Sequence, residues 1–392
     1  MSKCPLCFTQ LNSDEYAFTV RGTGNPGVEN PVASDYAGYQ VLQEGMIKLS
    51  RPEGDAAWYP NPGRTLMESE APAGTDIESE VCPECYFPLP DGWRQAGVTC
   101  IGLSGARASG KSLYIAVLVK ALSQYMVSRG TRLVPVNEST RDDYSKIYEE
   151  QLFVEQEVLN TTVPAKNSTV RLRPLIYSLG LINGKRQYLV LRDVAGEELE
   201  NLPAPAERLH LSFLSRADGI IFMFDPLAVD AVRRRLQDLV PAQIRTIGDP
   251  AVVLNNLQIL SQGTLGSGRF AVALSKFDAL QHLRNVDDAQ WSPIMSNPGA
   301  GFMRQTSDGG PFDENDSQLV SAEVRSLLKL IGGEEIVTQV RNPHSGQVVP
   351  HRFFATSSLG EPPEGSSLSR LGIAPYRVLD PVLWILAENG AM

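Results

Sequence analysis

The stretch that decides the fold is Gly105-Ala106-Arg107-Ala108-Ser109-Gly110-Lys111-Ser112. It matches the pattern G-x-x-x-x-G-K-[ST] at every fixed position, and it lies between an apolar strand-like run, Val98 to Leu103, and a helical segment, Ser112 to about Ser128. Glycines let the backbone wrap until successive N–H groups point inward at phosphate oxygens, and the helix adds the positive end of its dipole. The pattern therefore predicts a phosphate-binding loop.

Lys111 and Ser112 carry the chemistry expected of this loop. We expect the Lys111 ammonium to neutralise the β and γ phosphates and to act in catalysis, and the Ser112 hydroxyl to ligate Mg²⁺. The alternative is a glycine turn that merely precedes a core helix, and the correct flanking elements argue against it. The residues expected to contact nucleotide here are Gly105, Ala106, Arg107, Ala108, Ser109, Gly110, Lys111, Ser112 and Leu113.

A second acidic motif follows at the end of another strand-like run. Tyr188 to Asp193 continues as Val194-Ala195-Gly196, so Asp193 is suited to hold the Mg²⁺ shell. The Gly196 N–H is suited to bond the γ-phosphate. Alone, the pattern D-x-x-G is weak evidence because it is common in chains of this length.

Two later segments fit recognition of a base. Ser275-Lys276-Phe277-Asp278 ends an apolar strand, and a carboxylate at Asp278 can accept both the N1–H and the exocyclic amine of guanine, a pair that adenine does not offer. We expect Lys276 to lie along the base plane. Taken alone, this segment is equally consistent with a solvated loop. Near the end of the chain, Ser357 and Ser358 follow a further strand and are suited to contact a base edge.

Taken in order, these segments resemble the translation-factor and Ras-like class of P-loop GTPases, over roughly residues 97–390. The segments Gly105–Ser112, Asp193–Gly196, Ser275–Asp278 and Thr356–Ser358 correspond to the first, third, fourth and fifth motifs of that class. The resemblance implies a nucleotide site for GTP with Mg²⁺, and GTP rather than ATP as the ligand.

The chain departs from that class at several positions. Ser275 stands where the family has Asn or Thr, and Glu197 stands at the position of the catalytic Gln. A glutamate does not orient water as a neutral amide does, so we expect hydrolysis to be slow, to use other groups or to need an activator, with Glu197 as a candidate for positioning water. The switch threonine of the second motif remains open among Thr161, Thr162 and Thr169.

Strands and helices alternate after Val98, which predicts an α/β fold with a mostly parallel sheet, one antiparallel hairpin and helices on both faces. The Asn183-Gly184 pair predicts the hairpin. Two insertions are expected, around 241–268 and 285–350. The other elements expected are strands at Val170–Leu181, Arg186–Asp193, Gly219–Phe224, Arg269–Leu274 and Arg352–Ala355, helices at Arg141–Asn160 and Tyr376–Asn389, and short strand-like runs at Tyr39–Leu42 and Met46–Leu49.

Residues 1–96 differ from the P-loop part, residues 97–392, because they contain two C-P-x-C knuckles. Cys4 and Cys7 form the first, and Cys82 and Cys85 form the second. Two residues between thiolates let both bind one tetrahedral Zn²⁺, which predicts a zinc-ribbon-like β region with a long insertion between its halves. The alternatives are two separate incomplete sites or a disulfide pair. Cys100 lies inside the strand before the phosphate loop and is expected in the core.

The formal net charge of −10 argues against a nucleic-acid partner. No apolar run approaches the ~20 residues needed to span a bilayer, and no apolar stretch follows Lys3, so we expect a cytoplasmic protein with reduced thiols.

The layout of zinc ribbon and GTPase, together with Arg377–Trp384, is similar to bacterial double-GTPase-type proteins of multi-component conflict or signalling systems. The ordered set of motifs favours a nucleotide-dependent switch that protein partners read. The alternatives are a nucleotide-stabilised scaffold without hydrolysis, whose zinc ribbon docks a protein, and a P-loop ATPase.

Overall fold

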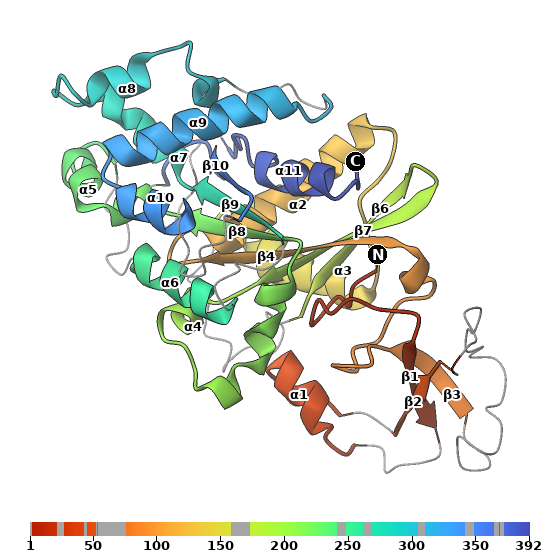
Figure 1. Ribbon diagram of the computed structural model, residues 1–392. Helices are drawn as coiled ribbons and strands as arrows, with labels where there is room; N and C mark the ends of the chain where they lie inside the picture. Colours follow the sequence, from red (N-terminus) through yellow and green to blue (C-terminus); the bar gives the residue numbers. More distant parts are fainter. Residues whose placement is uncertain are drawn as a thin grey trace.

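The protein is described here by a computed structural model. It covers residues 2–21, 27–42, 45–51, 53, 76–157, 173–240, 248–261, 268–304, 310–341, 349–363, 368 and 372–392. Two sheets organise these residues: a large one with helices on both faces, and a small antiparallel one formed near the N-terminus (Figure 1).

The large sheet has seven strands in the order β10-β9-β8-β4-β7-β6-β5. Strands β10, β9, β8, β4 and β7 are parallel, while β6 runs antiparallel to β7 and β5 antiparallel to β6. The expected α/β fold with one antiparallel hairpin is therefore confirmed. The strands are β4 (Gly97–Gly105), β5 (Val134–Pro135), β6 (Leu175–Ile182), β7 (Lys185–Asp193), β8 (Gly219–Phe224), β9 (Arg269–Leu274) and β10 (His351–Ala355).

The hairpin between β6 and β7 turns at Asn183 and Gly184. Their φ angles are 53° and 74°, and a two-residue turn with both residues at positive φ matches the right-handed twist of the flanking strands. The predicted hairpin is confirmed at the predicted residues.

Strand β4 is where the strand order reverses. Its neighbours are β7 on one side and β8 on the other, with Leu103 opposite Asp193 and Gly105 opposite Met223. The carboxyl ends of these parallel strands consequently meet at one edge of the sheet. Ligands of open α/β sheets bind in the crevice at such a switch point, so this edge is where the site should lie.

Helices cover both faces, and alternate residues of the central strands serve the two faces. Along β8, Ile220, Phe222 and Phe224 belong to one buried cluster, while Ile221 and Met223 belong to the other. This explains why β8 is apolar at every position. The helices are α2 (Lys111–Ser128), α3 (Glu138–Tyr144), α4 (Gly196–Glu200), α5 (Asp230–Leu236), α6 (Pro250–Leu260), α7 (Phe277–Gln281), α8 (Ser292–Ser296), α9 (Glu314–Leu330), α10 (Glu334–Arg341) and α11 (Asp380–Glu388).

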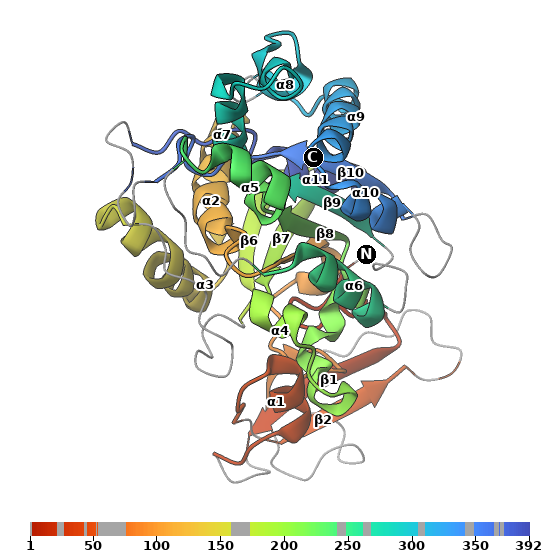
Figure 2. The ribbon, with the colours of Figure 1, turned by 90° about the vertical axis from the view of Figure 1, so that its left-hand side faces the viewer.

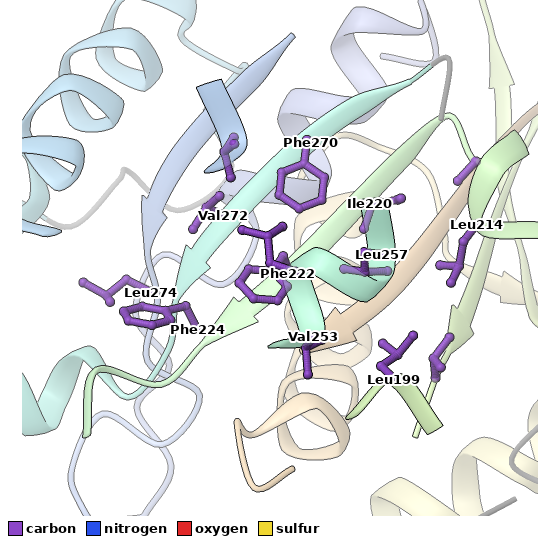
Figure 3. Close-up of a cluster of buried hydrophobic side chains, with 14 of the residues drawn as sticks. Leu199, Leu214, Ile220, Phe222, Phe224, Val253, Leu257, Phe270, Val272 and Leu274 are labelled. Carbon is purple, nitrogen blue, oxygen red and sulfur yellow. The ribbon is translucent and has the colours of Figure 1, made fainter. Parts of the chain in front are cut away.

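The ranges expected as insertions contain packed helices. Within 241–268, α6 buries Val253 and Leu257 against Phe222 and its neighbours on the sheet (Figure 3). Within 285–350 lie α8, α9 and α10, of which α9 buries a stripe that includes Val320 and Val324. These segments are therefore part of what covers one face of the sheet.

Several expected boundaries were wrong for local reasons. The helix expected from Arg141 begins at Glu138, because the Asn137 side chain caps it by accepting from the Thr140 N–H. It continues as a π-helical stretch, Ser145–Val154, and residues 158–172 lie outside the described residues. The last helix begins at Asp380 rather than Tyr376, since Arg377 has a φ of 49° that no α-helix accommodates.

The small sheet has the order β2-β1-β3 and is antiparallel throughout. Tyr39 to Leu42 was expected to be strand-like, but among the described residues it forms an isolated bridge, between Leu42 and Glu29, and no strand, whereas the run from Met46 is a strand. We call residues 2–96 of the described chain the cysteine module. Its elements are β1 (Glu15–Arg21), α1 (Pro31–Ala37), β2 (Met46–Ser50) and β3 (Asp76–Val81).

The cysteine module shares a hydrophobic core with the large sheet. The Trp93 ring stacks on Tyr188 of β7 with centroids 4.6 Å apart, and Phe8 meets Phe213 edge to face at 5.0 Å. Figure 2 shows the module below the large sheet, close to α4. No described helix is long and apolar enough to cross a membrane.

The buried ring of Phe222 provides a test of this core. We expect Phe222→Ala to lower the free energy of unfolding by about 3–5 kcal/mol, because it leaves a cavity between β8 and α6. The measurement is chemical denaturation followed by circular dichroism. The exposed Leu181 of β6 is the control, and Leu181→Ala should change stability by less than about 0.5 kcal/mol. Equal effects of the two variants would contradict this core.

Candidate functional site

The loop Gly105–Ser112 joins the carboxyl end of β4 to α2. Gly105, Ala108 and Gly110 have φ angles of 146°, 61° and 91°, so the backbone curls back on itself before the helix begins. Gly105 must be glycine because a Cβ there would lie 2.5 Å from the Met223 carbonyl oxygen. The N-terminus of α2 points into this curl, which makes it a place for an anion.

Lys111 lies at the centre of the loop. Its side chain is buried, and Nζ donates to the carbonyl oxygens of Gly105 (2.8 Å) and Ala106 (3.1 Å). Burial lowers the pKa of Lys111, while the nearby Asp193 and Glu200 raise it. Ser109 and Ser112 are buried and Leu113 is half-buried, and the Ser109 hydroxyl has no hydrogen-bond partner among the described residues. The loop thus surrounds the Lys111 ammonium, and the carboxylates of Asp193 and Glu200 lie nearby.

The end of β7 comes directly beside this loop. The Val194 N–H donates to the Leu103 carbonyl oxygen (3.2 Å), which extends the pairing of β4 and β7 past Asp193. Gly196 then opens α4 so close to the loop that a Cβ would lie 2.5 Å from the Arg107 nitrogen. The structure brings Asp193 and Gly196 to the loop, as the sequence predicted.

The residues expected to contact the base form a separate cluster at the ends of β9 and β10. Asp278 is buried, and its Oδ1 accepts a hydrogen bond of 2.6 Å from the Ser357 hydroxyl. Burial raises the pKa of the Asp278 carboxyl, and the Ser357 hydrogen bond opposes that rise. Ser358 is half-buried beside it, and Ser275 donates from its hydroxyl to the Phe224 carbonyl oxygen (3.1 Å). Residues from two distant parts of the chain are therefore joined here.

Lys276 is held by a residue that the sequence analysis missed. Its Nζ lies 2.6 Å from Oδ2 of Asp225, a buried carboxylate at the end of β8, and its φ of 50° is left-handed. The one local signal for Asp225 is an acidic residue directly after a wholly buried strand.

The candidates for the switch residue, Thr161, Thr162 and Thr169, lie outside the described residues.

The four knuckle cysteines form one cluster, so neither two separate sites nor a disulfide pair is present. Their sulfur atoms all lie within 4.8 Å of one another, and the cysteines are free thiols. Cys4 and Cys85 approach to 3.4 Å, and Cys7 and Cys82 to 3.7 Å. Tetrahedral zinc with Zn–S bonds of about 2.3 Å requires sulfur atoms about 3.8 Å apart, which these cysteines nearly match.

The two knuckles have the same backbone. In each, the residue after the second cysteine is left-handed, Phe8 at 58° and Tyr86 at 59°. The Phe8 N–H donates to the Cys4 carbonyl oxygen (3.1 Å), and the Tyr86 N–H donates to that of Cys82 (2.9 Å). Cys100, by contrast, lies in the core of β4, as expected.

A family model named Double-GTPase 2 matches residues 99–331, which is more than half of the chain. The chain belongs to the Double-GTPase 2 family. The match includes the phosphate loop, Asp193 to Gly196 and Ser275 to Asp278, whereas the knuckles and Ser357 lie outside it.

This Double-GTPase 2 protein also has a relative of full length. It is 43% identical over 396 residues, with 100% of each chain covered, to a proposed ESX-1 scaffolding and assembly protein, SaeC, from Mycolicibacterium smegmatis. Among solved structures, a proposed nucleolar GTP-binding protein 1 from Plasmodium falciparum is 10% identical with a TM-score of 0.26, covering 69% of this chain and 81% of that one. A bacterial selenocysteine-specific elongation factor, EF-Sec, is 10% identical with a TM-score of 0.28, covering 75% and 29% respectively.

In this Double-GTPase 2 protein, Arg107 ties the phosphate loop to α4. Its guanidinium lies 3.2 Å from a carboxylate oxygen of Glu197 and 3.2 Å from one of Glu200. The other Glu200 oxygen accepts from the Arg107 backbone N–H at 2.8 Å. Glu197 is thus engaged by a cation rather than held apart from the loop. The part played by Glu200 has no local signal in the sequence.

The close approach of Gly196 gives a test of the site's geometry. We expect Gly196→Ala to lower the free energy of unfolding by about 1–3 kcal/mol, because the new Cβ meets loop backbone that no side-chain rotation can move away. Thermal and chemical denaturation would measure this. Gly299→Ala is the control, since its Cβ would meet only the end of the Asn297 side chain at 3.2 Å. An unchanged stability of Gly196→Ala would show that the loop and α4 do not touch.

Proposed function

We propose that this protein binds GTP with Mg²⁺ at the carboxyl edge of the large sheet and acts as a nucleotide-dependent switch for protein partners. The observation that carries the proposal is that four motifs, spread from Gly105 to Ser358, meet along one sheet edge. The chain is a GTPase-type protein by family, and the buried Asp278 supports guanine as the base.

The phosphates would lie in the curl of the loop. The loop N–H groups and the N-terminus of α2 face the anion, and Lys111 supplies a cation within the same curl. Mg²⁺ prefers hard oxygen ligands, and Ser112 and Asp193 offer a hydroxyl and a carboxylate beside the loop. The residues present therefore fit Mg²⁺, which would neutralise charge on the β and γ phosphates. The Gly196 N–H would bond the γ-phosphate.

The base would lie against Lys276 with Asp278 at its edge. Ser357 holds Oδ1 of Asp278, which fixes the plane of the carboxylate toward the N1–H and amine of guanine. Asp225 fixes Lys276 in the same way, by a contact of 2.6 Å. Ser275 bonds backbone of β8, and Ser358 completes the edge contacts.

Slow or activated hydrolysis follows from the contacts of Glu197. Because its carboxylate is paired with Arg107 at 3.2 Å, Glu197 positions water only after that pair opens. This contact also supports the second candidate function, a scaffold that binds nucleotide without turnover. The relative named for ESX-1 scaffolding and assembly supports protein partners for this chain as well. Multiple-turnover release of phosphate from GTP, abolished in Lys111→Ala, would exclude the scaffold without turnover.

We propose that the four cysteines hold one structural Zn²⁺. All four ligand positions would be filled by thiolates, so the ion would stabilise the knuckles and take no part in catalysis. On this proposal residues 1–96 are a zinc-ribbon-like domain with a long insertion, and residues 97–392 are the GTPase domain.

Nucleotide preference provides the central test. We expect wild-type protein with Mg²⁺ to bind a non-hydrolysable GTP analogue more tightly than the ATP analogue, measured by calorimetry. Asp278→Asn should weaken the GTP analogue by about tenfold to a hundredfold and bind the xanthosine analogue better, because the Asn amide accepts from N1–H and donates to the C2 carbonyl that xanthine carries in place of the guanine amine. Lys111→Ala is the control, and it should weaken all three nucleotides. Tighter binding of ATP would refute guanine recognition.

Metal content tests the cysteine cluster. We expect one zinc per chain by atomic emission, and loss of that zinc in Cys82→Ser. The matched control is Cys100→Ser, since Cys100 is equally buried but lies outside the cluster. Zinc should be released as the pH falls, because protons compete for the thiolates. Wild-type protein purified without zinc or any other metal would contradict the proposal.

A further inference from the structure

Arg192 lies between the cysteine cluster and the nucleotide site. It directly precedes Asp193 in β7, and its side chain is buried. Its Nη1 donates to the Leu6 carbonyl oxygen, inside the first knuckle, at 2.5 Å. Its guanidinium lies 3.9 Å from the centre of the Phe213 ring. A buried arginine is costly unless it is paired, so these contacts fix its position closely.

Arg192 and Asp193 leave the strand on opposite faces. Val190 belongs to the buried cluster that includes the knuckle cysteines, whereas Leu191 belongs to the cluster on the side of α2. Because side chains alternate along a strand, Arg192 points to the cysteine module and Asp193 to the side of Lys111. A backbone held through Arg192 is therefore also the backbone that presents the Asp193 carboxylate.

The cysteine module also holds the segment that follows α4. Phe213 lies in the 3₁₀ segment Leu209–Arg216, and the centre of its ring is 5.0 Å from that of Phe8, the residue after the first knuckle. Arg216 pairs with Glu84 of the second knuckle at 2.7 Å. This segment also lies over β4, since a Cβ on Gly102 would meet the side chains of Phe213 and Leu214.

A further ion pair ties the module to β4. Lys3 contacts Asp218 at 2.6 Å, and the other Asp218 oxygen accepts from the Cys100 N–H of β4 at 2.8 Å. The first knuckle thus contacts the strand that ends in Asp193, the second knuckle contacts the segment after α4, and Lys3, just before the first knuckle, reaches through Asp218 the strand that enters the phosphate loop. Three cations, Arg192, Arg216 and Lys3, lie at this interface; Arg216 and Lys3 are paired with Glu84 and Asp218, and a tetrathiolate zinc centre would add two negative charges on the same side as Arg192.

We propose that the cysteine module is part of the nucleotide site and that Arg192 is a positioning residue, through which the module fixes the position of Asp193. The inference rests on the proposed function, because it concerns how Asp193 is presented to Mg²⁺. Arg192 does not touch nucleotide; it holds the end of β7 from the opposite face. Nucleotide affinity gained from Mg²⁺ therefore depends on the cysteine module.

The test is a double-mutant cycle read through Mg²⁺. Affinity for a non-hydrolysable GTP analogue is measured with and without added Mg²⁺ in wild type, Arg192→Met, Asp193→Asn and the double variant. We expect Arg192→Met to bind the analogue as tightly as wild type when Mg²⁺ is absent. When Mg²⁺ is added, its increase in affinity should be about tenfold smaller than that of wild type, as for residues that orient metal ligands. Asp193→Asn should lose at least as much of the Mg²⁺-dependent affinity, and the double variant should lose no more of it than Asp193→Asn alone.

Arg186→Met is the matched control, because Arg186 lies in the same strand but is exposed. If Arg192 had a purely structural role, Arg192→Met would lower the affinity equally with and without Mg²⁺, or its loss of affinity would add to that of Asp193→Asn in the double variant. Either result would overturn the proposal, as would an unchanged Mg²⁺ gain in Arg192→Met. Wild type that binds no nucleotide would instead refute the proposed function.

A milder variant covers the case in which Arg192→Met does not fold. Phe213→Leu keeps an apolar side chain under the guanidinium but removes the ring face. We expect Phe213→Leu to retain zinc, measured by atomic emission, and to lose part of the Mg²⁺ gain in the same direction. A folded, zinc-loaded Phe213→Leu with the full gain would show that the interface only docks the two parts together.

Discussion

Gly196 and the peptide that joins Ala106 to Arg107 lie against each other with no side chain between them. The approach is possible because β4 and β7 are adjacent and parallel, so the loop after one strand and the turn after the other leave the sheet at the same edge. The contact brings the start of α4 over the loop and places Glu197 and Glu200 within reach of Arg107. Without it, the acidic motif would be a strand end with no relation to the phosphate loop.

The cysteine module is integral to this arrangement rather than an appendage. Its core continues into that of the large sheet through Trp93 on Tyr188 and Phe8 on Phe213. Its charged contacts fall on β7, on β4 and on the segment between α4 and β8, which are the elements that carry or flank the acidic motif. The two knuckles lie side by side although they are far apart in the chain, with their four sulfur atoms within 4.8 Å of one another.

Basic side chains lie at the candidate site although the chain as a whole carries a net negative charge. The chain is acidic, yet Lys111 and Arg107 lie at the loop and Lys276 lies at the ends of β8 and β9, beside Asp225. Each is paired with loop carbonyls or with carboxylates, so a polyanionic ligand would exchange one set of partners for another. An exchange of this kind at Arg107 would release Glu197 and Glu200 together, and both lie in α4.

The sequence by itself determined the phosphate loop, the β6–β7 hairpin, the α/β class and the pairing of cysteines in knuckles, because each depends on residues close together in the chain. Glycine at positive φ and an Asn-Gly turn are local backbone requirements. The start of α11 escaped prediction although its cause is also local, a left-handed residue at Arg377. The pairs Arg192 with Leu6 and Arg107 with Glu200 had no sequence signal, and the pair of Lys276 with Asp225 had none beyond an acidic residue after a buried strand. Only the tertiary structure decided them, because the order of strands in the sheet, rather than distance along the chain, sets which side chains meet.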